Sequence, residues 1–310
     1  MAHITFATGA ASLSDAEAIY MLGRSIQDFG GGLKNAGLHV YIPEAEFEGW
    51  KAIAQKLKDA GISLHMFKAS KEELAFMYAF KPLAAHAAEQ DLGEGTVVWM
   101  DRHSLVTGNC ADFVLNPWEH FAYRPVNIRN IGSLYGGPAS GFWQDAFDIA
   151  GVTMSSLFPI CSSVDRQMIN PYFFACLYAF RPADGLMERW KELFEALKCH
   201  PVMEKHLLVE ENRIFLHQAA LCLAVLKNIP REAMRELPYY YGYPLHLHGE
   251  IPEVYRVSSM DRLNTTYFYR ELHDWQKAAE GIAVSQGLGQ WLTERIEEAK
   301  ALCSPMAGRL

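Results

Sequence analysis

The feature that most constrains this chain is a regular alternation of apolar and amphipathic segments over roughly its first hundred residues. Short β-rich runs occupy residues 4–9, 38–42, 62–67 and 96–100. The segments between them repeat apolar residues at helical spacing, as at Ile19, Leu22, Ile26 and Phe29. Strands that are apolar almost throughout, each followed by a helix, are typical of a parallel sheet covered on both faces. The sequence therefore predicts an α/β fold with a mostly parallel central sheet.

Sheets of this kind bind ligands beyond the carboxyl ends of their strands. The fourth run makes this edge conspicuous, because the apolar residues TVVWM lead directly into Asp101, Arg102 and His103. An ionised group at the tip of a buried strand must be paired, solvated or bound to a ligand. We therefore expect a polar site at this edge.

The second half of the chain is less regular. Residues 107–165 are rich in glycine, proline, asparagine and aromatic residues, and they are apolar enough to predict a folded, loop-rich region that covers a site. Residues 171–180 predict a further buried strand, and residues 186–198 and 211–227 predict helices. Residues 271–303 predict an amphipathic helix with a break.

Composition excludes several classes of function. The formal net charge is −8 and there is no basic block, which argues against nucleic acid as a partner. The six cysteines form no CxxC pair, so structural zinc and thioredoxin-type redox chemistry lack support. The N-terminus does not resemble a signal peptide, and no apolar run approaches the ~20 residues that span a bilayer. These features predict a cytoplasmic protein without a membrane span.

Five segments in order resemble the nucleotide-diphospho-sugar transferases of the GT-A type. They read VVWMDRHSLV, NPWEHFAYRPVNIRNIGS, PYFFACLYAFRP, HQAALCLAV and YPLHLHG, and the resemblance covers nearly the whole chain. It implies the GT-A fold and transfer of a sugar from a nucleoside-diphosphate sugar to an acceptor that the sequence does not identify. It also implies a divalent cofactor, Mn²⁺ or Mg²⁺, because the family's fourth strand ends in a metal-binding Asp-x-Asp motif.

The resemblance assigns site residues position by position. The implied metal ligands are Asp101, His103 and His248. The residues implied or expected to contact the donor are Thr8, Gly9, Ala10, Lys81, Arg124, Asn130 and Gln218. No catalytic base emerges, since the carboxylates Asp145 and Asp148 fit surface or capping positions, and inversion or retention of the sugar configuration stays unassigned.

Plainer roles stay open for several of these residues. Asp101 could instead cap a turn, His103 could be a solvated loop histidine, and Lys81 could extend along an apolar helix face to solvent. The chain also departs from the family pattern, with His103 replacing the second Asp of the motif. The further replacements are Phe174 for Asn, Cys176 for Gly and His217 for Asp. They leave the implied fold intact and raise the question of turnover.

Two alternatives to a metal-dependent transferase follow. The first is a catalytically silent protein that kept the fold and binds nucleotide or glycan. The second is a zinc hydrolase that uses His246 and His248, an HxH pair whose side chains share one face if the segment is a strand. For the leading interpretation we expect one domain, 1–310, with a nucleotide-binding half (1–106), a donor and acceptor half (107–270) and a helical extension (271–310).

Overall fold

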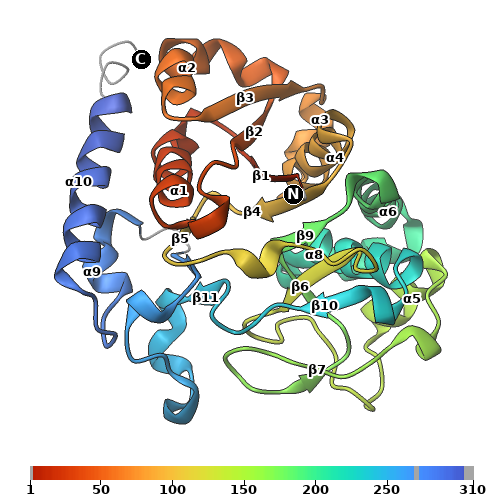
Figure 1. Ribbon diagram of the computed structural model, residues 1–310. Coiled ribbons are helices and arrows are strands. Elements are labelled where there is room, and N and C mark those ends of the chain that lie inside the picture. The colour runs from red at the N-terminus through yellow and green to blue at the C-terminus, as the bar shows by residue number, and fades with distance from the viewer. Residues whose placement is uncertain (1–2, 269–271, 304–310) are drawn as a thin grey trace.

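A seven-stranded sheet forms the centre of the computed structural model, which describes residues 3–268 and 272–303 (Figure 1). Its strand order is β10-β6-β9-β4-β1-β2-β3. The strands are β1 (Ile4–Gly9), β2 (Leu38–Pro43), β3 (Ile62–Phe67), β4 (Thr96–Met100), β6 (Phe121–Pro125), β9 (Phe173–Phe180) and β10 (Met234–Glu236). β1 to β4 are parallel, while β9 runs antiparallel to β4 and β6. The predicted α/β class with a mostly parallel sheet is confirmed.

Helices cover both faces of the sheet because neighbouring residues of each strand point to opposite sides. Phe6 and Val98 pack on one side with α1 (Ala16–Phe29) and α2 (Phe47–Asp59). Ala7 and Trp99 pack on the other side with the remaining large helices. Those are α4 (Phe80–Leu92), α5 (Gly141–Ala150), α6 (Leu186–Cys199) and α8 (Glu210–Asn228).

The helix expected between the third and fourth strands is divided in two. α3 (Lys71–Ala75) begins with a capping box in which Ser70 and Glu73 bond each other's backbone N–H groups. The chain then breaks, Tyr78 adopts a left-handed φ of 60°, and α4 follows. Pro82 explains the break, because proline is tolerated in the first turn of a helix but not in its interior.

The end of β4 is the point where the chain leaves the large sheet. Directly after the Asp101–His103 turn, β5 (Ser104–Val106) joins a smaller sheet with β12 (Thr265–Tyr267) and β11 (Tyr243–Pro244). A separate pair, β7 (Ile160–Cys161) and β8 (Met168–Ile169), lies in the loop-rich region. The turn after β4 is therefore held between two sheets.

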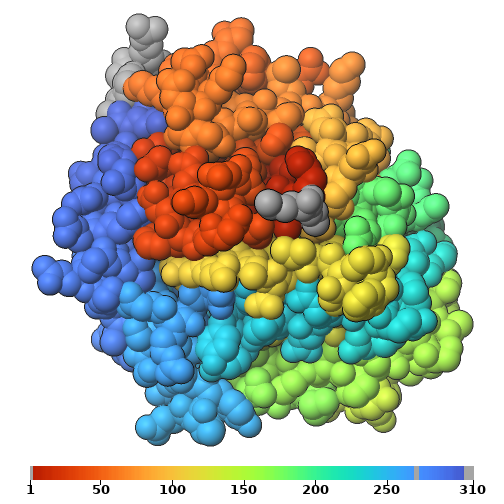
Figure 2. Space-filling view, in the orientation of Figure 1, coloured from red at the N-terminus to blue at the C-terminus, as the bar shows by residue number. Residues whose placement is uncertain are grey.

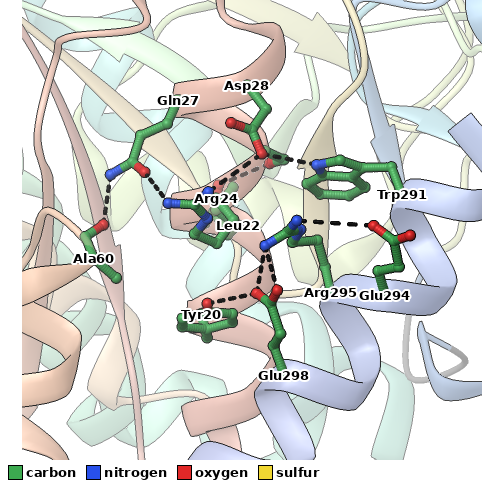
Figure 3. A network of polar contacts seen from close by, with 11 residues as sticks. Tyr20, Leu22, Arg24, Gln27, Asp28, Ala60, Trp291, Glu294, Arg295 and Glu298 are labelled. Atoms are coloured by element: carbon green, nitrogen blue, oxygen red, sulfur yellow. Dashed lines mark hydrogen bonds and ion pairs between the residues drawn. The ribbon is translucent and has the colours of Figure 1, made fainter. Parts of the chain in front are cut away.

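The C-terminal extension packs against the first helix. α10 (Gln286–Cys303) lies along α1, and Figure 2 shows this blue segment covering one side of the red N-terminal region. Trp291 Nε1 donates to Asp28 at 2.8 Å, and Tyr20 donates its hydroxyl proton to Glu298 at 2.9 Å (Figure 3). The short α7 (Glu204–Leu207) and α9 (Trp275–Ala278) complete the α-helices of the described residues.

Within residues 3–268 and 272–303, none of the helices combines the length and apolar character needed to cross a bilayer. The predicted C-terminal helix is broken as expected, because α9 ends at Ala278 and α10 begins at Gln286. Residues 269–271 and 304–310, which include parts of the predicted boundary and extension, lie outside the described residues. The boundaries 1–106, 107–270 and 271–310 stay predictions.

Candidate active site

A cavity of about 290 Å³ opens at the edge where β4 and β6 end and where the antiparallel β9 begins. Its walls come from the turn after β4, the start of α4, the first residues of β9, α8 and the 3-10 helix η9 (Leu245–Glu250). The predicted site residues that line it are Lys81, Asp101, His103, Asn130 and Gln218. The tertiary structure thus brings residues far apart in sequence to the predicted edge.

A buried ion pair lies in the wall of this cavity. Lys81 Nζ is 2.8 Å from Asp101 Oδ2, with the two side chains 6% and 4% exposed. Lys81 also contacts Cys176 Sγ at 3.4 Å and lies 5.3 Å from the ring centre of Tyr78. The sequence-based alternative of a lysine that extends to solvent is therefore wrong.

The ion pair keeps both of its members charged. Burial alone raises the pKa of Asp101, but the attraction of Lys81 and Arg102 outweighs this effect, so the pKa lies well below its ordinary value. Burial likewise lowers the pKa of Lys81, and Asp101 more than compensates, so the pKa lies above its ordinary value. For His103 burial dominates and lowers the pKa, which favours the neutral imidazole.

Asp101 also has the structural role that the sequence left open. Its Oδ1 accepts the backbone N–H of His103 at 3.1 Å, which is the bond of an Asx turn. Next to it, Arg102 pairs with Asp15, and the Arg102 guanidinium lies 5.5 Å from the ring centre of Phe80. The carboxylate of Asp101 is thus fixed from both sides, by its own turn and by α4.

Gly9 explains how α4 comes close enough to place Lys81. A Cβ at Gly9 would lie 2.9 Å from Ala84 Cβ, closer than two methyl groups can pack.

We expect Gly9→Ala to destabilise the fold by about 1–3 kcal/mol, because the helix must move away from β1. Its displacement should also weaken ligand binding at Lys81. Chemical denaturation measures the first effect, and Gly32→Ala, where the added Cβ meets nothing within 4 Å, is the control. Equal stability of the two variants would contradict this packing.

Several expected donor-binding residues lie elsewhere. Thr8, Gly9 and Ala10 are buried in the packing around β1 and do not line the cavity. Arg124 is buried too, but it lines a different, neighbouring cavity. Hydrogen bonds from the Arg124 guanidinium to the Leu237 carbonyl and to Ser163 Oγ hold it there.

The two histidines of the HxH pair point in different directions. His246 lines the cavity, whereas His248 accepts or donates a 2.7 Å bond with the Tyr243 hydroxyl and packs near Gly281. The segment is a 3-10 helix with three residues per turn, so side chains two positions apart cannot share one face. This placement favours His246, rather than the predicted His248, as the histidine that contacts a ligand in the cavity. The zinc-hydrolase alternative requires both histidines at one site, and their side chains do not meet at one site.

The donor set of the cavity does not fit a divalent ion as it stands. Asp101 is the one carboxylate among the lining residues that the structure describes, and Lys81 already occupies one of its oxygens. Among the described residues, no group of three or more His, Cys, Asp or Glu side chains is arranged to hold a metal. The geometry thus supports a permanent ammonium beside Asp101 rather than the predicted ion held by Asp101, His103 and His248.

The cavity is also lined by Phe174, Cys176 and His217, the residues that depart from the family pattern. Tyr78 and Tyr267 line it as well, and sequence reasoning did not assign them to the site. Phe174 meets Tyr267 edge to face at 5.3 Å between ring centres, which makes this wall apolar. Pro82 was the one sequence signal that could have placed Tyr78 in the site, because it predicts the helix break in which Tyr78 lies. The carboxylates Asp145 and Asp148 lie on α5 and do not line the cavity.

Comparisons with known proteins agree with this architecture. A family model described as the Rhodobacterales glycosyltransferase domain matches residues 9–228. The galactosyltransferase LgtC, solved with donor and acceptor sugar analogues, is similar over 99% of this chain and 100% of its own, with a TM-score of 0.50 and 12% identity. The apo form of the glycosyltransferase GlyE from Streptococcus pneumoniae TIGR4 is similar over 100% of this chain and 64% of its own, with a TM-score of 0.51 and 12% identity. No curated protein matches the chain in sequence.

The mostly parallel sheet with helices on both faces is shared with these two proteins, and it is the GT-A fold. The family match covers well over half of the chain. The chain belongs to the Rhodobacterales glycosyltransferase domain family, and it is a transferase enzyme.

Proposed function

We propose that this enzyme transfers a sugar from a nucleoside-diphosphate sugar to an acceptor, with the donor in the cavity around Asp101. The observation that carries the proposal is the Lys81–Asp101 pair, buried at the edge of the sheet where such folds bind ligands. A charged pair in a cleft with strongly shifted pKa values is a typical functional site.

The chemistry of the reaction suits the charges in this cavity. The diphosphate gains negative charge as the glycosidic bond breaks, so nearby cations stabilise the leaving group. Of the described residues, Lys81 and Arg102 are cations that line the cavity. An ammonium has three N–H donors, and Asp101 and Cys176 account for two of those of Lys81, which leaves a donor for a phosphate or sugar oxygen. Asn130 and Gln218 add amide groups to the wall.

The family resemblance implies metal dependence, whereas the donor set of the cavity favours nucleotide binding without an ion, and no step of the proposal depends on one. Because Lys81 already pairs with Asp101, we expect nucleotide affinity to change less than about tenfold when EDTA replaces manganese, a difference of under 1.4 kcal/mol. Calorimetric titration of UDP and GDP in both conditions measures this. A larger loss in EDTA would show that an ion displaces Lys81 from the carboxylate.

Donor binding is tested by thermal and chemical denaturation with nucleoside diphosphates and their sugar derivatives. A ligand at one hundred times its Kd should stabilise the fold by about 2.7 kcal/mol. The double variant Lys81→Met/Asp101→Asn, which removes both charges together, should lose this stabilisation. Asp148→Asn, on the exposed surface of α5, should retain it.

Turnover separates the enzyme from the silent-binding alternative raised by Phe174 and His217. We expect slow hydrolysis of the bound sugar nucleotide, released as free sugar and nucleoside diphosphate. Nucleotide binding without any hydrolysis or transfer would favour the silent protein. No stabilisation by any nucleotide would overturn the proposal itself.

A further inference from the structure

A second cavity, of about 540 Å³, adjoins the first. Gly242 borders the second cavity, and a Cβ there would lie 3.7 Å from Phe174 Cε1, which lines the first. Pro244 of the second cavity is the strand partner of Tyr267 in the first. Phe174 and the β11–β12 pair therefore form a wall one side chain thick between the two cavities.

One arginine that lines this second cavity, Arg124, is held by hydrogen bonds to neighbouring residues of the fold. Arg124 is 5% exposed, and its guanidinium donates to the Leu237 carbonyl at 2.7 Å and to Ser163 Oγ at 2.8 Å. Glu236 lies 3.5 Å from the same group. The carboxylate that lines the cavity is thus matched by Arg124, and this pair leaves little net charge.

The other arginine is differently placed. Arg166 is exposed, and its guanidinium stacks 4.2 Å from the ring centre of Tyr255. In the described part of the chain no carboxylate lies within salt-bridge distance of Arg166, which sets it apart from Arg124. Its φ of 53° is a left-handed conformation that costs an arginine free energy, so the surrounding structure holds it there.

The remaining lining is mostly aromatic and apolar. Tyr239, Tyr243 and Tyr255 present their rings to the cavity, together with two prolines and aliphatic side chains. Tyrosine combines a flat apolar face with a polar hydroxyl, which matches the alternating C–H and O–H surface of a sugar. A guanidinium pre-stacked on a ring presents its N–H donors in the plane that carboxylate and phosphate groups recognise.

We propose that the second cavity binds the acceptor, and that this acceptor is a saccharide with an anionic group, either a carboxylate or a phosphate. Its sugar rings would lie against the tyrosines and its anion against Arg166. The assignment to an acceptor rests on the proposed function of the neighbouring cavity. The binding of an acidic saccharide follows from this cavity alone.

Three small probes test the chemistry. Methyl β-D-glucuronide carries a carboxylate, glucose 6-phosphate carries a phosphate, and methyl β-D-glucoside is neutral. We expect at least one of the two anions to bind about tenfold more tightly than the neutral glycoside, as judged from Kd values by ligand-observed NMR. Which anion gains more identifies the acidic group.

Variants locate the binding. Arg166→Ala should abolish the preference for the anion and leave affinity for the neutral glycoside unchanged, whereas Tyr255→Ala should weaken binding of all three probes. Arg189→Ala, which changes an arginine of α6 whose side chain is 59% exposed, is the matched control. Unchanged melting temperatures show that the variants fold.

The outcomes are distinct. Equal binding of acidic and neutral probes, an undiminished preference in Arg166→Ala, or no binding of any probe would each overturn the inference. Nucleotide stabilisation, measured separately, is expected to be unaffected by Arg166→Ala. If the acidic probes bind through Arg166 but no nucleotide binds, the donor proposal fails and the acidic-saccharide site remains without its role as acceptor site.

Discussion

Replacing Lys81 by methionine is expected to lower the free energy of unfolding by about 3–5 kcal/mol, because it leaves the buried Asp101 carboxylate without its counter-charge. Methionine preserves most of the aliphatic length of lysine, so packing contributes little to the loss. Chemical denaturation at pH 7.5 measures the change.

A second variant separates the charge from the packing. In Lys81→Met/Asp101→Asn neither side chain is charged, and we expect most of the lost stability to return, since no ion is left buried without a partner. Lys51→Met is the control, because that lysine pairs with Glu48 at an exposed position, 55% and 81% exposed, where the change should cost under about 1 kcal/mol. A Lys81→Met protein as stable as the wild type would show that the pair does not form.

Function should not recover with stability. The double variant restores the fold but lacks the ammonium that we place beside the diphosphate. A stable double variant that still binds nucleoside diphosphates with wild-type affinity would therefore contradict the proposed donor site while leaving the stability argument intact.

Acid is expected to destabilise the protein through His217. Burial is the main cause that lowers the pKa of this imidazole to about 3, and the positive charge of Lys81 lowers the pKa further. The imidazole ring packs against the ring of Tyr78, with 5.0 Å between the ring centres. Asp101 acts in the opposite direction with a smaller effect. The unfolded chain, with a histidine pKa near 6.5, binds a proton that the folded chain does not.

The sign of the effect follows from this difference. Above pH 6.5 neither state binds the proton, so the stability that the neutral imidazole contributes is fully present. As the pH falls from about 6.5 towards about 3, that stability is lost at up to about 1.4 kcal/mol per pH unit. The pKa of His39, lowered to about 4 by burial and by His65, adds a loss in the same direction.

The measurement compares unfolding free energies of the wild type and His217→Gln between pH 7.5 and pH 4.5. The variant should be less stable at pH 7.5, and the gap between the two proteins should narrow as the pH falls. His3→Gln, at an exposed position, should follow the wild type in parallel. A gap that stays constant with pH would mean that His217 is accessible to protons in the folded state.

Local patterns were sufficient for much of the fold. The runs at 4–9, 38–42 and 96–100 are apolar because both faces of their strands are largely buried, so their position and parallel pairing could be read directly. The run at 62–67 forms the edge strand β3, which is only partly buried. The polar tip of β4 was visible for the same reason, since charge beside such a run is conspicuous.

The orientation of short irregular segments could not be read in this way. His246 and His248 would share a face on a strand, but the segment folds as a 3-10 helix and only His246 meets the cavity. Thr8, Gly9 and Ala10 lie at the end of β1, at the correct edge, yet all three are buried, and α4 packs directly on Gly9. Their exposure depends on how closely a helix approaches, and sequence spacing carries no information about that distance.

The sequence by itself determined the layered sheet, the edge that carries the site and the presence of Asp101 at that edge. Only the tertiary structure decided which charge faces Asp101. Lys81 and Asp101 are twenty residues apart on different elements, and Gly9, on a third, lets them approach to 2.8 Å. The strength of an electrostatic interaction depends on the distance between the charges and on their burial, and the fold sets both. A linear sequence pattern contains neither quantity. The aspartate that the sequence predicts as a metal ligand is therefore the partner of a lysine in the structure.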